Sequence, residues 1–242
     1  YPNYEALIYG KRSYTWKNVY DRACQFASSL KKIGVGKGDT VSVMAANTPE
    51  LFEAHYSIPM SGAVINTINT RLDSNTVAYI LEHSDAKVFI VDRQFKKIVE
   101  KSLSILKKKI VVIDINDEQS NLPDEGAIGE YEYESFLAKG DKEFDYQKPK
   151  DEWQAISLNY TSGTTGRPKG VVYHHRGSYL MSMGSVTAWD MPNRLTYLYT
   201  VPMFHCNGWG YPWTVPMLIG RTICLRNIDV KKIFELIDKY NV

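Results

Sequence analysis

Hydrophobic positions in the first part of the chain repeat first with the period of a helix and then as buried strands. From Thr15 to Ile33 apolar residues recur every three to four positions, which predicts an amphipathic helix with Thr15 as its cap. Apolar runs over 38–47 and 62–68 predict strands. Between them, residues 48–58 predict a second helix, with Thr48 as its cap and a proline at its first position. A strand, a helix and a strand in this order indicate a parallel sheet.

The same alternation continues as far as residue 115. The pattern predicts helices over 74–83 and 95–106 and strands over 87–92 and 109–114. Residues 116–150 are polar and acidic, with glycines among the charges, so we expect a surface connection that holds one short helix within 131–140. This connection would separate a first subdomain, about 1–115, from a second one, about 151–242.

The second subdomain mixes strands and helices in the same way. The pattern predicts strands over 155–160, 170–175, 195–201 and 221–226, a helix over 176–188, and an irregular aromatic segment before the last strand. The final residues, Val230–Val242, have a helical period, and their apolar side chains are expected to face inward: Ile233, Phe234, Leu236, Ile237 and Tyr240. The fold class predicted is therefore α/β, with mostly parallel β-sheets flanked by helices in two subdomains.

The composition supports a globular protein and excludes several classes of partner. The chain has 242 residues, 44% of them hydrophobic, which is enough for a buried core. Lys and Arg number 29 against 27 Asp and Glu, so the formal net charge is only +2 and indicates no nucleic-acid partner and no anionic membrane surface. The longest apolar stretch, 195–220, is interrupted by prolines and glycines, so no transmembrane segment is predicted.

The cysteines and the N-terminus bear on the compartment. Cys24, Cys206 and Cys224 lie far apart, so neither a disulfide framework nor a zinc site is supported. We expect a reducing compartment, the cytoplasm, and the sequence leaves a peroxisome or another organelle open. No signal pattern precedes the first helix, and because the first residue is Tyr1 rather than methionine, we expect that the chain has been trimmed.

The stretch "YTSGTTGRPKGV", Tyr160 to Val171, combines glycines, hydroxyl residues and two cations. Glycines let backbone N–H groups turn toward a ligand, and hydroxyls and cations add donors and positive charge, so this composition suits a polyphosphate. A Walker A loop would need glycine where Pro168 stands and Ser or Thr where Gly170 stands, so that interpretation fails. An ordinary hairpin turn between two strands is the plain structural alternative.

The order of residues in this stretch resembles, position for position, the phosphate-loop signature of the adenylate-forming (AMP-binding) superfamily, which includes acyl-CoA synthetases, coumarate-CoA ligases, luciferases and the adenylation domains of peptide synthetases. The resemblance implies that this loop binds the β- and γ-phosphates of ATP. It implies that Thr161 shares in Mg²⁺ binding. The residues that would bind ATP are Thr161, Ser162, Gly163, Thr164, Thr165, Gly166, Arg167, Pro168 and Lys169.

A second motif, "VPMFHCNGW" at Val201 to Trp209, resembles the gate motif of fatty acyl-CoA synthetases. In that motif a histidine lies beside the substrate carboxylate and a tryptophan controls entry to the acyl tunnel. The resemblance assigns His205 the catalytic role and assigns the acyl gate to Phe204, His205, Asn207, Gly208 and Trp209. Ordinary core packing is the alternative for the aromatic residues of this segment.

The resemblance also covers residues 12–41 and 47–72, so it extends through nearly the whole chain. It implies the N-terminal part of the adenylate-forming fold and an acid–thiol ligase. ATP with Mg²⁺ would convert a carboxylic acid, expected to be a short- or medium-chain fatty acid, to an acyl-adenylate. The acyl group would then pass to coenzyme A, the co-substrate. The partners expected are thus small molecules, and the sequence leaves a homodimer open as the assembly.

Later motifs of the family are not in the sequence: the adenine-stacking loop, the ribose-binding aspartate, the hinge and the C-terminal domain with its catalytic lysine. We therefore expect an incomplete N-terminal portion of an enzyme, inactive by itself. An aryl- or amino-acid adenylating domain is the alternative within the superfamily. A non-catalytic module that binds nucleotide or a partner is the alternative from another class. The sequence does not specify the length or substituents of the acid.

The remaining histidines and a cysteine are expected to have structural roles. Neighbouring side chains in an extended segment point to opposite sides, so Cys206 is not expected to pair with His205 and is assigned to packing. The adjacent His174 and His175 are not expected to share a metal for the same reason. His55 and His83 lie in predicted helices and are interpreted as packing or surface residues.

Overall fold

The computed structural model describes residues 1–120, 123, 126–146, 148–161 and 167–242. Its strands are β1 (Glu5–Tyr9), β2 (Arg12–Thr15), β3 (Thr40–Met44), β4 (Val64–Thr67), β5 (Ala86–Asp92), β6 (Val111–Ile115), β7 (Tyr131–Glu132), β8 (Ala155–Thr161), β9 (Lys169–His174), β10 (Thr196–Tyr199) and β11 (Arg221–Cys224). Its helices are α1 (Trp16–Lys32), α2 (Pro49–Met60), α3 (Ser74–His83), α4 (Lys96–Ile105), α5 (Tyr133–Leu137), α6 (His175–Ala188), α7 (Cys206–Trp209), α8 (Tyr211–Met217) and α9 (Val230–Tyr240), with a short 3₁₀ turn at Arg93–Phe95 before α4.

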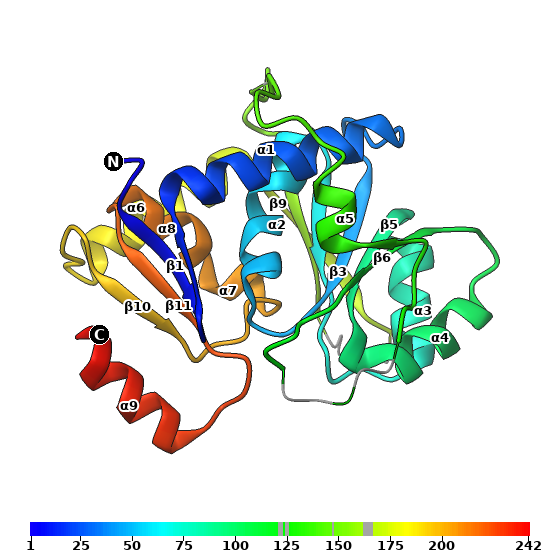
Figure 1. Cartoon of the computed structure of the whole chain (residues 1–242). Helices are drawn as coiled ribbons and strands as arrows, with labels where there is room; N and C mark the ends of the chain where they lie inside the picture. The colour runs from blue at the N-terminus through cyan, green and yellow to red at the C-terminus, as the bar shows by residue number, and fades with distance from the viewer. Residues whose placement is uncertain (121–122, 124–125, 147, 162–166) are drawn as a thin grey trace.

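Two β-sheets stand side by side in the molecule (Figure 1). Within the described residues, the larger sheet has the strand order β7–β6–β5–β3–β4–β8–β9 and the smaller one the order β10–β11–β1–β2. Neighbouring strands of the larger sheet run parallel except for β9, which is antiparallel to β8. The α/β class and the mostly parallel sheets predicted from the sequence are confirmed.

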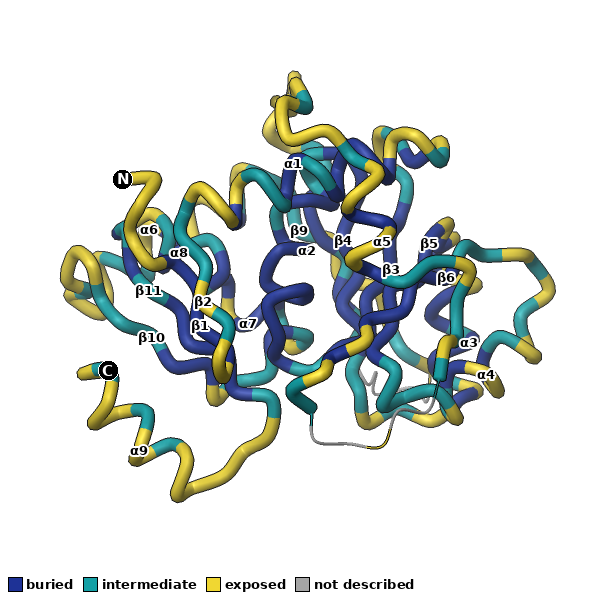
Figure 2. The backbone as a smooth tube through the Cα atoms, in the orientation of Figure 1, coloured by how far each residue is buried: buried dark blue, intermediate teal, exposed yellow. Residues whose placement is uncertain are grey.

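Both faces of the larger sheet are covered because its central strands are apolar on both sides. Val41 and Val88 pack with helices α1, α2 and α5 on one face. Phe89 and Val91 pack with helices α3 and α4 on the other face. Figure 2 shows the buried residues concentrated in this sheet and in the helices beside it. Continuous apolar strands are the usual signature of a parallel sheet with helices on both faces, which explains why the alternation of elements was readable.

The sheets do not divide at the predicted connection. Strands β8 and β9 follow residues 116–150 in sequence but extend the sheet built by β3 to β7. Strands β1 and β2 come first in sequence but pair into the sheet that holds β10 and β11. The predicted subdomain boundaries remain a prediction, since both sheets draw strands from before and after that segment.

Several elements differ from the sequence-based expectation. The hairpin of β1 and β2 was not predicted, although the two-residue turn at Gly10, with φ +56°, is a hairpin signal. The aromatic segment expected to be irregular contains α7 and α8. Thr15 caps α1 as predicted, by accepting a hydrogen bond from the Asn18 N–H, whereas the Thr48 side chain makes no capping bond to α2.

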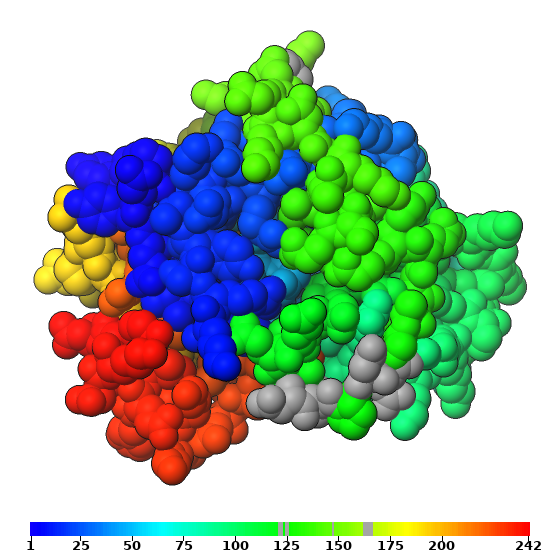
Figure 3. Space-filling view, viewed as in Figure 1, coloured from blue at the N-terminus to red at the C-terminus, as the bar shows by residue number. Residues whose placement is uncertain are grey.

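Helix α9 lies on the outside of the molecule, next to the N-terminal segment (Figure 3). Ile233, Leu236 and Tyr240 pack on the small sheet, as expected. Phe234 is 68% exposed and Ile237 39%, so the prediction that these two face inward is wrong. Apolar residues cover a wider arc of this helix than a single contact with the sheet can bury.

A buried ion network joins the loop after β11 to the larger sheet. The Arg226 guanidinium lies 2.8 Å from an Asp92 carboxylate oxygen and 2.6 Å from one of Asp117. The Tyr9 hydroxyl donates to Asp117 at 2.5 Å. Burial raises the pKa of the Asp92 carboxyl, an effect that the Arg226 charge opposes.

No described helix is both long and apolar enough to cross a membrane.

Candidate active-site cleft

The predicted phosphate loop closes the hairpin of β8 and β9. Thr161 ends β8 directly opposite Lys169, the first residue of β9, and both are exposed. Because β8 is parallel to β4, Thr161 lies at the carboxyl end of the strands, the edge where open α/β sheets bind ligands. Of the predicted ATP-binding residues, the described ones are Thr161, Arg167, Pro168 and Lys169. Ser162, Gly163, Thr164, Thr165 and Gly166 lie outside the described residues, and their roles stay predictions.

Helix α3 contacts the hairpin beside the loop, at Tyr160 and Pro168. The Tyr160 hydroxyl and His83 Nδ1 share a hydrogen bond of 2.7 Å, and the Tyr79 hydroxyl donates to the Pro168 carbonyl oxygen at 3.4 Å. The rings of Tyr79 and His83 stack with centroids 5.3 Å apart. Burial raises the pKa of Tyr160 to about 12, so its phenol stays protonated and able to donate. Sequence reasoning gave His83 only a packing or surface role, because nothing local in the sequence pairs it with Tyr160.

Two cations flank the loop. Arg167 and Lys169 are both exposed. Their charges are therefore available to an anion at the carboxyl end of the sheet.

The gate motif contains a left-handed turn. Cys206, Asn207, Gly208, Trp209 and Gly210 have φ of +48°, +52°, +57°, +58° and +71°, so the four residues of α7 and the glycine that follows them are all left-handed. For a residue with a Cβ this conformation costs about 1–2 kcal/mol, which glycine avoids. Gly208 is required for a second reason, because a Cβ there would lie 2.9 Å from the Tyr199 ring.

Buried hydrogen bonds hold this turn against the larger sheet. Asn207 Oδ1 accepts from Ser157 Oγ at 2.5 Å and from Asn159 Nδ2 at 2.7 Å, and Asn207 is 0% exposed. Thr67 Oγ1 lies 3.0 Å from Asn159 Oδ1 and 2.9 Å from the Phe204 carbonyl oxygen, two acceptors that share its single proton. Strands β4 and β8 thus hold Phe204 and Asn207 of the gate motif in place.

A cleft of about 540 Å³ lies where the gate motif meets strand β9 and helix α6. Its lining residues are Val172, Tyr173, His174, Gly177, Ser178, Met181, His205, Cys206 and Trp209. Trp209 is 59% exposed, which excludes the core-packing alternative for this side chain. The structure therefore brings His205 and Trp209 together in one cleft, whereas Phe204, Asn207 and Gly208 do not line it.

The expectation that His205 and Cys206 point to opposite sides is wrong. His205 Nε2 lies 4.0 Å from Cys206 Sγ, and both residues line the cleft. The expectation assumed an extended backbone, but the left-handed turn places both side chains on the same side. Burial raises the pKa of Tyr173, and the neighbouring Cys206 thiol contributes to the rise, so this phenol stays neutral in the cleft.

Helix α8 anchors the far end of the gate segment on α2. Trp213 Nε1 donates to the His55 carbonyl oxygen at 3.1 Å, and the Tyr56 hydroxyl donates to the Pro212 carbonyl oxygen. His55 is buried, which confirms its packing role, and burial lowers the pKa of its imidazole to about 4. His174 caps α6, because its Nδ1 accepts from the Gly177 N–H at 2.9 Å.

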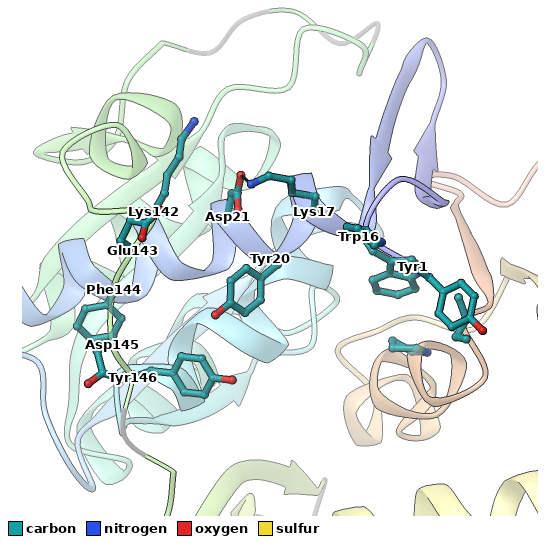
Figure 4. A pocket seen from close by; sticks show the side chains of 13 residues that line it. Tyr1, Trp16, Lys17, Tyr20, Asp21, Lys142, Glu143, Phe144, Asp145 and Tyr146 are labelled. Carbon is teal, nitrogen blue, oxygen red and sulfur yellow. Dashed lines mark hydrogen bonds and ion pairs between the residues drawn. The ribbon is translucent and has the colours of Figure 1, made fainter.

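Another hollow, of about 740 Å³, lies between α1 and the segment 142–146 (Figure 4). Lys17 and Asp21 form an ion pair of 2.7 Å at its edge. Its lining includes no residue of the two motifs, so we do not assign it to the active site.

Comparisons with known proteins show the family of the chain. The sequence matches the family described as AMP-binding enzyme over residues 1–242. It is 44% identical to an acetate/butyrate–CoA ligase of Arabidopsis thaliana and 41% identical to a benzoate–CoA ligase of the same plant, both named as peroxisomal. These alignments cover 100% of this chain but only 44% and 43% of the two relatives.

A solved structure supports the fold. The o-succinylbenzoate coenzyme A synthetase of Bacillus subtilis, determined in complex with ATP and a magnesium ion, superposes with a TM-score of 0.81 at 21% identity. The match covers 100% of this chain and 59% of that one. The fold, the family profile and the relatives agree, and the chain belongs to the AMP-binding enzyme family.

Proposed function

We propose that the full-length protein activates a carboxylic acid with ATP and transfers the acyl group to coenzyme A. One carboxylate oxygen attacks the α-phosphorus of ATP, the bond to the bridging oxygen of the β-phosphate breaks, and pyrophosphate leaves. The coenzyme A thiol then attacks the acyl carbonyl carbon and AMP leaves. The chain spans about 44% of the length of its plant relatives, so this activity is a proposal for the whole protein.

The observation that carries the proposal is the junction of the two motifs. Strand β9 begins at Lys169 with the phosphate loop and continues into Val172, Tyr173 and His174, which line the same cleft as His205 and Trp209. One strand therefore links the predicted site for the ATP phosphates to the predicted site for the acid. A non-catalytic binding module would not need this junction.

The residues on the phosphate side would act by charge and position. Arg167 and Lys169 would stabilise the negative charge that builds up as pyrophosphate departs. Mg²⁺ enters with ATP as part of the substrate. It prefers oxygen ligands and is often held by substrate phosphates with few protein groups, so the exposed Thr161 hydroxyl fits as a ligand. No described group of three or more His, Cys, Asp or Glu could hold a metal separately.

The acid side would be served by His205 and Trp209. The His205 imidazole can donate a hydrogen bond to the carboxylate and orient one oxygen toward the α-phosphorus, which lowers the barrier through positioning. The exposed indole of Trp209 lines the cleft and would limit which acyl groups enter. No protein nucleophile is required in this scheme.

Short-chain fatty acids are the substrate class that we favour. The supporting observation is the identity of 44% to a ligase named for acetate and butyrate. An aryl acid is the second candidate, which the benzoate–CoA ligase at 41% identity supports. The names of these relatives also support a peroxisomal location as an alternative to the cytoplasm, and imaging of a fluorescent fusion of the full-length protein distinguishes the two. The homodimer stays a prediction that sedimentation of the purified protein tests.

The experiment that tests the function is acid-dependent exchange of labelled pyrophosphate into ATP by the full-length protein. Acetate, butyrate, hexanoate and benzoate form the panel, and omission of the acid is the control. Exchange that requires an acid supports the proposal. ATP binding without exchange for any acid supports the non-catalytic alternative instead.

A further inference from the structure

The centre of the gate motif, Asn207, faces the protein rather than the cleft. Its side chain is fully buried and accepts two hydrogen bonds from strand β8, from Ser157 and from Asn159. Residues 157 and 159 lie on the same side of the strand, and Thr161, where the phosphate loop starts, follows two residues later. The side chain of Asn207 therefore connects the gate to the strand that leads into the phosphate loop.

The turn around Asn207 needs such a connection. Cys206 and Trp209 both have a Cβ and both hold a positive φ, a conformation that persists only where surrounding contacts impose it. Backbone hydrogen bonds within the turn include those from the Gly208 N–H to the His205 carbonyl oxygen and from the Gly210 N–H to the Asn207 carbonyl oxygen, both 2.9 Å. These bonds close the turn but do not attach it to the sheet.

We propose that Asn207 is a positioning residue, which holds the left-handed turn on β8 and thereby sets His205 and Trp209 relative to the phosphate loop. The inference rests on the proposed function, because it assigns those two residues to the acid. Ser157 and Asn159 complete the anchor. Loss of the anchor lets the turn relax toward ordinary backbone angles, which moves the imidazole and the indole without touching the ATP side.

A glycine at position 207 distinguishes loss of the side-chain anchor from backbone strain. Glycine adopts a positive φ freely, so Asn207→Gly adds no backbone strain but removes the oxygen that accepts the two hydrogen bonds. If the anchor matters, Asn207→Gly and Asn207→Ala both loosen the turn. Ser157→Ala removes the partner hydroxyl and leaves Asn207 in place. Ser29→Ala is the matched control. Ser29 lies in helix α1, and its buried hydroxyl donates to the Phe136 carbonyl oxygen at 2.8 Å, so this variant also deletes a buried hydroxyl donor.

The first measurement is amide hydrogen exchange at Gly208 and Gly210, which does not depend on activity. The two Asn207 variants and Ser157→Ala should exchange roughly tenfold faster there than the wild type, because the turn opens locally. Ser29→Ala should match the wild type at these amides. Unchanged exchange in Asn207→Gly would overturn the anchor.

The second measurement is steady-state kinetics of the full-length protein with butyrate and hexanoate. We expect the KM for the acid to rise about tenfold and the preference between the two acids to change in the anchor variants, while the KM for ATP stays within about twofold. Faster amide exchange with unchanged acid kinetics would overturn the positioning role. A wild-type protein without acid-dependent turnover would refute the proposed function, and the positioning role with it, while amide exchange still tests the anchor itself.

Discussion

Two tryptophans four residues apart, Trp209 and Trp213, should affect different properties when each is replaced by alanine. Trp209 is 59% exposed at the cleft, whereas Trp213 is half-buried against α2 and donates a hydrogen bond to the His55 carbonyl oxygen at 3.1 Å. We predict that Trp209→Ala alters the choice of acid and leaves stability nearly unchanged. Trp213→Ala should lower stability.

The magnitudes follow from burial. Truncation of a fully buried tryptophan costs about 3–5 kcal/mol, so a half-buried one should cost about 2 kcal/mol. The lost hydrogen bond to His55 adds about 1 kcal/mol, which gives about 3 kcal/mol for Trp213→Ala. For a chain of this size that corresponds to a fall in Tm of about 6–12 °C. Trp209→Ala removes an exposed side chain and should stay within about 0.5 kcal/mol of the wild type.

The assay pairs thermal unfolding of the 242-residue chain with acid ranking by the full-length protein. Trp209→Ala should reorder acetate, butyrate and hexanoate by kcat/KM while the KM for ATP stays the same. Trp213→Ala should leave the order of the acids unchanged and lower the Tm. If Trp209→Ala unfolds several degrees earlier and leaves the order of the acids intact, Trp209 is a packing residue and not a gate.

Three further predictions concern pH, the phosphate loop and the ion network. Burial lowers the pKa of His55 to about 4, so between pH 6.5 and pH 4 the imidazole binds a proton in the unfolded chain but not in the folded chain. The free energy of unfolding is therefore highest above about pH 6.5 and falls by up to ~3 kcal/mol toward pH 4. In urea titrations across this range, His55→Phe should reduce this dependence of stability on pH. Thr165→Ala should reduce turnover about ten- to a hundredfold at limiting ATP, since a hydrogen bond to a charged group contributes about 1.5–3 kcal/mol; unchanged kinetics would exclude the phosphate role. Arg226→Met should cost about 3–5 kcal/mol in denaturant titration because the buried Asp92 carboxylate loses its cation and the buried Asp117 carboxylate loses one of its partners, whereas the exposed pair broken by Lys232→Met should cost under about 1 kcal/mol.

The sequence predicted the elements of the larger sheet well because their signals are local. Each strand is an apolar run and each helix has its own period, as at Ser74–His83, where prediction and structure coincide. The partners of each strand are a different matter. Strand β1 lies beside β11, more than 200 residues later, and no local pattern records which distant strand completes a sheet.

The candidate site was predictable in its residues but not in their orientation. The motif singled out His205 and Trp209, which share a cleft, and also Asn207, which turns inward. The left-handed turn directs the Asn207 side chain inward. It also places Cys206 on the same side as His205, whereas alternation along an extended segment predicted opposite sides. Gly208 and Gly210 were the available signal, because glycines two apart favour positive φ.

Acid-dependent exchange of labelled pyrophosphate into ATP is the measurement that shows whether this protein joins a phosphate site to an acid site. With the full-length protein, ATP and Mg²⁺, we predict exchange that needs an added carboxylic acid, is faster with butyrate than without acid, and is lost about a hundredfold or more in His205→Ala, because positioning of the carboxylate fails. If exchange is absent for every acid in a protein that still binds ATP, the protein does not activate carboxylic acids.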